Sequence, residues 1–237
     1  MKASEAVLAF DCATAATVVG LSIGGELVCD LADRPSDGER PRHAQRLLML
    51  CEEALAEASI DWGQLGRIGV GVGPGTFTGL RIGVATAQGL SQASGLPLVA
   101  VSTLEALALP ARAADPLARV AAVVDARRGE AFVAGWAPSG EQVVADQSCV
   151  PARLAAALAA KAGPSLAVGD GALIFRKELE IGAITVPDDD SPLHLLSGGA
   201  LCELAAVGDP VGLELLVPNY VRRPDAEISV QRSRKIE

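Results

Sequence analysis

The fold of this chain is decided by the stretch Gly71-Val72-Gly73-Pro74-Gly75-Thr76-Phe77-Thr78-Gly79-Leu80-Arg81. Its alternate glycines, placed after an apolar run, let a strand turn sharply into a helix and leave backbone N–H groups open at the helix start. Such a turn can hold an anion, although it matches neither a Walker loop nor a dinucleotide fingerprint. A purely structural turn is the alternative interpretation. The candidate nucleotide or anion contacts are Asp11, Gly73, Gly75 and Thr76.

The residues after this turn predict a helix with an unusual surface. From Gly79 to Ser94 it carries one charge, Arg81, and no acid. A surface helix normally has one apolar stripe and one charged face, whereas this helix offers little to water in any direction. Either it is enclosed in its own domain, or one face meets another protein. Small residues at every fourth position would let a partner helix approach closely; they are Gly79, Gly83, Ala87 and Ser91.

Working outward, strands and helices alternate along the whole chain. Apolar runs predict strands at 6–12, 17–23, 26–31, 67–72, 96–101, 119–125, 131–136, 142–148, 165–168 and 184–187. Helices are predicted at 42–59, 79–94, 103–114, 151–162, from 172, and at 193–207. Two halves that each mix strands and helices favour an α/β protein with two similar lobes. We expect the lobes to be residues 1–108 and 109–237, with the final segment free to return to the first.

Composition narrows the classes of protein and partner. The formal net charge is −9 and the isoelectric point is about 4.8, so the chain is poorly suited to grip a phosphate backbone by itself. Five scattered cysteines without a C-x-x-C pair argue against a disulfide framework. The start lacks a signal peptide's basic region, and no uncharged apolar stretch reaches the roughly 18 residues of a membrane span. We therefore expect a cytoplasmic protein with no membrane contact.

Several segments together resemble the TsaB family. The stretch GPGTFTGLRIGVATAQGLS at 73–91 is very similar to the central family motif, and FDCATAATVVGLS at 10–22 is similar to its first hairpin. Asp125-Ala126-Arg127-Arg128-Gly129-Glu130 is similar to its D-A-R-x-x-E segment, and Pro218-Asn219-Tyr220-Val221-Arg222 to its closing P-x-Y-x-R. The central motif is specific, the shorter ones less so, and together they span residues 7 to about 222.

This resemblance implies the fold of actin, hexokinase and the heat-shock chaperone ATPases. It also implies a non-catalytic scaffold and activator of TsaD, the paralogue that transfers threonylcarbamoyl to the adenosine next to the tRNA anticodon. The ATPase TsaE would join the complex, tRNA would be contacted through the complex, and the chain alone would form a homodimer. Helices 42–59 and 79–94 would contact TsaD. The implied interface residues are Leu48, Met49, Phe77, Leu80, Gly83, Val84, Ala87 and Gln88.

The residues themselves support loss of catalysis. TsaD-like enzymes carry an H-x-x-x-H metal pair on a helix, but His43 is followed four residues later by Leu47. The other histidine, His194, is distant in sequence. Ala13 stands where actin-like ATPases favour the glycine of D-x-G. We therefore expect no catalytic residue, no metal and no cofactor.

Other patterns leave alternatives open. Gly20-Leu21-Ser22-Ile23-Gly24 matches a nucleophile elbow, but it lies in a predicted strand pair instead of a strand-to-helix turn. A small-molecule kinase or peptidase of the same fold, and an unrelated α/β binding module, are the competing hypotheses. Basic residues near two of the motifs are candidate RNA or partner contacts, against the default of a surface pair and a frayed terminus; they are Arg127, Arg128, Arg222 and Arg223.

Overall fold

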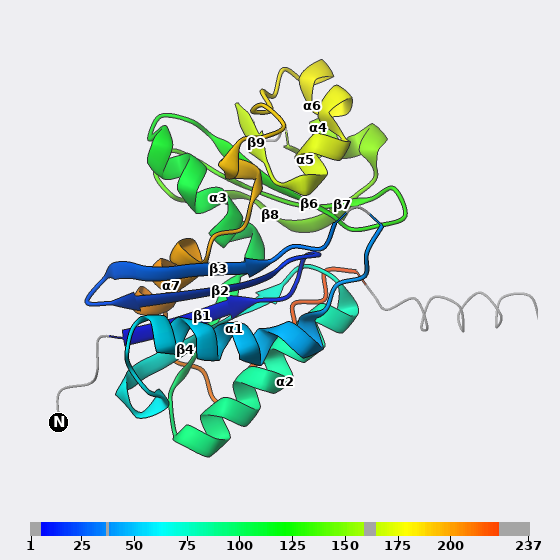
Figure 1. The fold of residues 1–237 in the computed structure, drawn as a ribbon. Helices are drawn as coiled ribbons and strands as arrows, with labels where there is room; N and C mark the ends of the chain where they lie inside the picture. The colour runs from blue at the N-terminus through cyan, green and yellow to red at the C-terminus, as the bar shows by residue number, and fades with distance from the viewer. Residues whose placement is uncertain (1–5, 37, 159–164, 223–237) are drawn as a thin grey trace, which may run out of the picture.

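A five-stranded mixed β-sheet forms the centre of the first lobe (Figure 1). The computed structural model describes residues 6–36, 38–158 and 165–222. The strands are β1 (Ala6–Asp11), β2 (Thr17–Ile23), β3 (Glu26–Asp33), β4 (Leu65–Gly73) and β5 (Leu98–Ser102), in the order β3-β2-β1-β4-β5. Strands β1 to β3 form an antiparallel meander, and β4 and β5 join it in parallel.

A four-stranded sheet repeats this connectivity in the second lobe. Its strands are β6 (Val120–Asp125), β7 (Ala131–Trp136), β8 (Gln142–Cys149) and β9 (Leu166–Val168), in the order β8-β7-β6-β9. Strands β6 to β8 form the meander and β9 pairs in parallel with β6, as β4 pairs with β1. The repeated plan confirms the prediction of an α/β protein with two related lobes. The predicted strand at 184–187 is reduced to a single bridge between Thr185 and Leu166.

Helices cover both faces of the first sheet. The helices are α1 (His43–Glu57), α2 (Phe77–Ser94), α3 (Thr103–Ala114), α4 (Pro151–Leu158), α5 (Asp170–Ile174), α6 (Arg176–Ile181) and α7 (Gly198–Val207), with 3₁₀ turns at Trp62–Gln64 and Pro192–His194. Side chains of β1 alternate between the faces: Leu8 and Phe10 pack with α1 and α2, and Val7 and Ala9 pack with α3 and α7. Of the predicted helix 151–162, residues 159–162 lie outside the described part.

The start of α7 differs from the prediction of one helix over 193–207. The backbone passes through a 3₁₀ turn at Pro192–His194, and α7 begins only at Gly198. Asp30 of β3 fixes this start, because its carboxylate accepts hydrogen bonds from Gly198 N at 2.9 Å and Ser197 Oγ at 2.8 Å. Gly20 and Gly198 meet so closely that a Cβ on either would overlap the other's backbone. The helix therefore lies directly on β1, β2 and β4.

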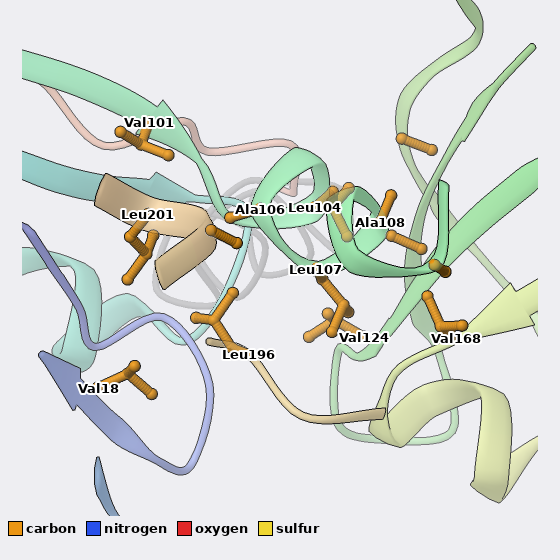
Figure 2. Close-up of a cluster of buried hydrophobic side chains, with 14 of the residues drawn as sticks. Val18, Val101, Leu104, Ala106, Leu107, Ala108, Val124, Val168, Leu196 and Leu201 are labelled. Carbon is orange, nitrogen blue, oxygen red and sulfur yellow. The ribbon is translucent and has the colours of Figure 1, made fainter. Parts of the chain in front are cut away.

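One apolar core is shared by the two lobes (Figure 2). Val18 and Val101 enter it from the first sheet, and Val124 and Val168 enter it from the second. Leu104 and Leu107 of α3, with neighbours Leu196 and Leu201, fill the space between the sheets. The space between the lobes is therefore largely occupied by packed side chains. The division at residue 108 stays a prediction.

Candidate partner-docking surface

The glycine turn between β4 and α2 is tied to the chain's own polar groups. Asp11 is fully buried, and its carboxylate accepts hydrogen bonds from Ala13 N and Thr103 Oγ1, both at 2.6 Å. Gly73 N donates to Thr103 Oγ1 at 3.1 Å, and Thr76 N donates to Ala13 O at 2.7 Å. Burial raises the pKa of Asp11. Because two of the candidate anion-binding N–H groups have internal acceptors, the geometry favours a structural turn.

The small-residue face of α2 points into the first lobe. Leu80 and Ala87 are almost fully buried and Val84 is 6% exposed. Val84 and Ala87 belong to the core of the first lobe, and the Leu80 side chain lies against Gly73. A Cβ added to Gly79 would overlap the carbonyl oxygen of Cys12, so the small residue lets the helix approach that backbone. The expectation that Leu80, Gly83, Val84 and Ala87 meet a partner directly is therefore wrong, since these residues are core.

The opposite face of α2 is exposed and carries one charge. The exposed residues of α2 are Phe77, Thr78, Arg81, Ala85, Gly89, Gln92, Ala93 and Ser94. Beside it on the same side of the sheet, α1 exposes Leu48 and Met49 at 50% and 51% (Figure 1). The predicted residues Leu48, Met49 and Phe77 are thus accessible. Gln88 is half-buried, and its Nε2 donates to the carbonyls of Leu213 and Leu216.

The closing segment of the described chain lies against α2. Leu216 is fully buried in the first lobe, and Asn219 N donates to Val72 O at 2.7 Å. Tyr220 Oη accepts from Arg81 Nε at 3.1 Å, and the rings of Tyr220 and Phe77 lie 5.3 Å apart. We use the name docking surface for a set of exposed side chains of these three elements, apolar ones together with Arg81: Leu48, Met49, Phe77, Arg81, Ala85, Leu215, Val217 and Tyr220. The P-x-Y-x-R pattern was the available sequence signal for this contact.

Two adjoining hollows share Arg34, Leu195 and Leu196. One lies between the lobes, measures about 160 Å³ and is lined by Thr14, Arg34, Thr103, Asp170, His194 and Leu196 among others. The other measures about 380 Å³ and is lined by Asp30, Pro110 and Pro192 among others. Typical ligand pockets measure roughly 300–1,000 Å³.

Asp170 accepts hydrogen bonds from Asp125 N and Gly171 N, and burial raises its pKa. His43 is buried against Thr17 Oγ1 at 2.9 Å, and burial lowers its pKa. In residues 6–36, 38–158 and 165–222, no group of three or more His, Cys, Asp or Glu could hold a metal ion.

The predicted basic contacts lie around the β6–β7 hairpin. Arg127 and Arg128 have φ values of 62° and 56°, and Gly129 follows at 74°. Arg127 pairs with Asp125 at 3.1 Å. Arg222 reaches the same hairpin, where its Nη1 lies 3.1 Å from Glu130 Oε2. Arg223 lies outside the described residues.

In the described part, no helix is long and apolar enough to cross a membrane.

Known proteins match both the sequence and this architecture. Residues 35–176 match the family model of TsaD, tRNA N6-adenosine threonylcarbamoyltransferase. The tRNA threonylcarbamoyladenosine biosynthesis protein TsaB of Bacillus subtilis is 30% identical over 207 residues, covering 83% of this chain and 86% of that protein. The Escherichia coli protein of the same name is 36% identical over 131 residues, and the match spans about half of its length, 53%. The structure of YeaZ from Pseudomonas aeruginosa superposes on this one with a TM-score of 0.72 at 28% sequence identity. The superposition covers 90% of this chain and 100% of that chain.

Proposed function

Since this chain belongs to the TsaB family, with its α/β actin-like fold of two related lobes, we propose that it binds and activates TsaD. It acts in tRNA threonylcarbamoyladenosine biosynthesis as an accessory subunit and contributes no catalytic group. TsaE joins the same complex, and tRNA is reached through the complex. Family membership excludes the hypothesis of an unrelated α/β module.

The observation that carries this proposal is the docking surface. The outer face of α2 exposes apolar and small residues with one charge, and the exposed Leu48 and Met49 lie on the neighbouring helix. Exposed apolar residues gathered on neighbouring helices commonly mark a protein interaction site. Ala85 and Gly89 carry so little side chain that a partner helix could approach the α2 backbone closely.

In this proposal the chain activates TsaD by fixing the position of the TsaD helix that it binds. A helix of TsaD packed on α1 and α2 would be held rigidly by the sheet beneath, because the inner faces of both helices are core. The partner's reacting groups would then be oriented by contacts that this chain makes with the partner's backbone and not with the substrate. Orientation of this kind is a recognised source of rate enhancement. The formal charge of −9 fits a subunit that leaves tRNA binding to its partners.

The test compares two charge insertions at exposed sites. Ala85→Arg places a guanidinium in the middle of the docking surface. Val207→Arg places one on α7, which packs on the opposite face of the first sheet and where Val207 is 81% exposed. An unpaired charge in an interface costs several kcal/mol, so Ala85→Arg should weaken TsaD binding at least about a hundredfold. Both variants should melt like the wild type, and Val207→Arg should bind and support threonylcarbamoylation normally. A folded Ala85→Arg variant that still binds and activates TsaD would refute the proposal.

The competing hypothesis is a kinase or peptidase of the same fold. Gly20-Leu21-Ser22-Ile23-Gly24 lies in β2 and the turn after it, with no helix following, so the context of a nucleophile elbow is missing. We expect the purified chain to show no ATP or peptide hydrolysis above background and no stoichiometric zinc or iron. Turnover that copurifies with the chain through several columns would favour the enzyme hypothesis.

A further inference from the structure

The segment Pro218–Arg222 is bonded to both lobes at once. On the first lobe, Asn219 N donates to Val72 O, and Tyr220 Oη accepts from Arg81 Nε. The Tyr220 ring also lies 5.3 Å from that of Phe77, over which the Arg81 guanidinium is stacked at 3.7 Å. The contacts among Tyr220, Phe77 and Arg81 belong to the docking surface. The segment therefore helps to set the positions of the first exposed side chains of α2.

The other end of the same segment is held by the second lobe. Arg222 Nη1 lies 3.1 Å from Glu130 Oε2, which also accepts a hydrogen bond from Ser148 Oγ at 2.9 Å. The Arg222 guanidinium lies 5.9 Å from the centre of the Phe132 ring. Asn219 Nδ2 donates to Asp146 Oδ2 at 3.0 Å. Residues of β7, β8 and the hairpin before β7 thus fix the segment from the second lobe.

The chain between the two anchors is short. Tyr220 and Arg222 are two residues apart, so the backbone between them spans at most about 7 Å. Pro218, at the start of the segment, has a fixed φ, which further limits its freedom. A displacement of the β6–β7 hairpin cannot be absorbed by so little chain. It must move Tyr220, rotate the side chains of Arg222 and Glu130, or break their pair.

From this geometry we propose that Pro218–Arg222 couples the second lobe to the docking surface, with Glu130 and Arg222 as positioning residues. The state of the β6–β7 hairpin sets the position of Tyr220, and Tyr220 sets Phe77 and Arg81. The consequence for partner binding rests on the function proposed above. The coupling itself is a property of the isolated chain and can be measured without a partner.

The sequence supplies a probe, because Tyr220 is its single tyrosine. The protein labelled with 3-fluorotyrosine should give one ¹⁹F resonance that reports this ring. Glu130→Gln weakens the pair with Arg222 and should shift or broaden the resonance, although Glu130 does not touch Tyr220. Glu180→Gln is the matched control, since it makes the same chemical change in another partly exposed ion pair of the second lobe, that of Glu180 with Arg176, which does not touch the segment. It should leave the resonance unchanged.

A charge exchange separates coupling from general damage to the fold. Arg222→Glu should perturb the resonance, and the double variant Glu130→Arg with Arg222→Glu should restore it by remaking the pair in the opposite sense. Melting temperatures of all variants should stay near that of the wild type, because the pair is partly exposed. A resonance that ignores Glu130→Gln, or a double variant as perturbed as Arg222→Glu alone, would overturn the coupling.

A binding measurement then tests the consequence. Glu130→Gln should weaken binding to TsaD about fivefold, at the low end of usual coupling between distant sites, whereas Glu180→Gln should not. Equal affinities of wild type and Glu130→Gln would overturn the link to docking. If the wild type itself fails to bind TsaD, the proposed function fails, and the ¹⁹F response alone decides whether the lobes are coupled.

Discussion

Asp11 and Thr103 form a buried pair in which each side chain satisfies the other. Thr103 Oγ1 donates to the Asp11 carboxylate and accepts from Gly73 N, so one hydroxyl joins β1, the glycine turn and α3. Thr103→Val keeps the shape but leaves both partners unsatisfied, which costs about 1–3 kcal/mol for each buried polar group. We expect urea unfolding to show this loss as a lower free energy of unfolding for Thr103→Val than for the wild type. Thr103→Ser keeps the hydroxyl and should stay close to the wild type; equal losses in both would contradict the account.

The raised pKa of Asp11 predicts a pH dependence of stability. A carboxyl whose folded pKa lies above its unfolded value of 3.8 binds protons more tightly in the folded state. Its contribution is therefore fully present below pH 3.8 and is lost as the pH rises through the folded pKa. Asp11→Asn removes this titration, so the difference in unfolding free energy between this variant and the wild type should move in favour of the variant as the pH rises. Urea unfolding of both proteins at several pH values measures this difference. A difference in unfolding free energy that does not change with pH would argue against the raised pKa of Asp11.

At the scale of elements, α2 shows how small residues set a helix on a sheet. A Cβ on Gly79 would overlap Cys12 O, whereas a Cβ on Gly83 would meet Cys12 Cβ and Val70 at ordinary distances of 3.8 and 3.9 Å. Gly79→Ala should therefore destabilise the chain by several kcal/mol or prevent folding. Gly83→Ala should be neutral, or stabilising by up to about 1 kcal/mol through helix propensity. Thermal melts of the pair test this, and similar melts would show that α2 is not held as close as described.

Val84 gives a related prediction on the same helix. Its side chain is 6% exposed in the core of the first lobe. Val84→Arg should therefore unfold the protein instead of producing a folded variant that cannot dock, because a buried unpaired charge costs several kcal/mol. Circular dichroism should show that Val84→Arg is unfolded and Ala85→Arg is folded, although the two positions are neighbours in sequence and differ only in the face of α2 on which they lie. A well-folded Val84→Arg variant would show that the inner face has been assigned wrongly.

Much of the element pattern could be predicted from local sequence, and the exceptions have physical causes. The turn at 71–81 and the helix after it are set by nearby glycines and apolar residues, which local rules describe well. The inner face of α2 could not be identified from the sequence, because the single charge, Arg81, is too little to distinguish a charged face from an apolar one. The start of α7 depends on Asp30, which is distant in sequence. The contact of Tyr220 with Arg81 likewise joins residues far apart, so the motif suggested importance without location.

At the scale of the whole molecule, the docking surface predicts self-association. A symmetric dimer would remove the exposed apolar residues on α1, α2 and the closing segment of both copies from water. We expect light scattering at roughly tens of micromolar to report a homodimer that Ala85→Arg disrupts and Val207→Arg does not. TsaD should compete with it for the same surface. A strict monomer, or a dimer that TsaD leaves intact, would contradict this prediction.

The position of α7 has a consequence for how the protein is made. This helix lies on β1, β2 and β4, yet it is the last helix of the described chain to leave the ribosome. Until residue 207 emerges, the face of the first sheet that carries Val7, Ala9 and Val18 has no cover from α7. The first sheet of a nascent chain must therefore wait until residue 207 has emerged before α7 can enclose it. A chaperone that shields apolar strands during synthesis should be needed most in that interval, and a stop codon before Gly198 should yield insoluble protein.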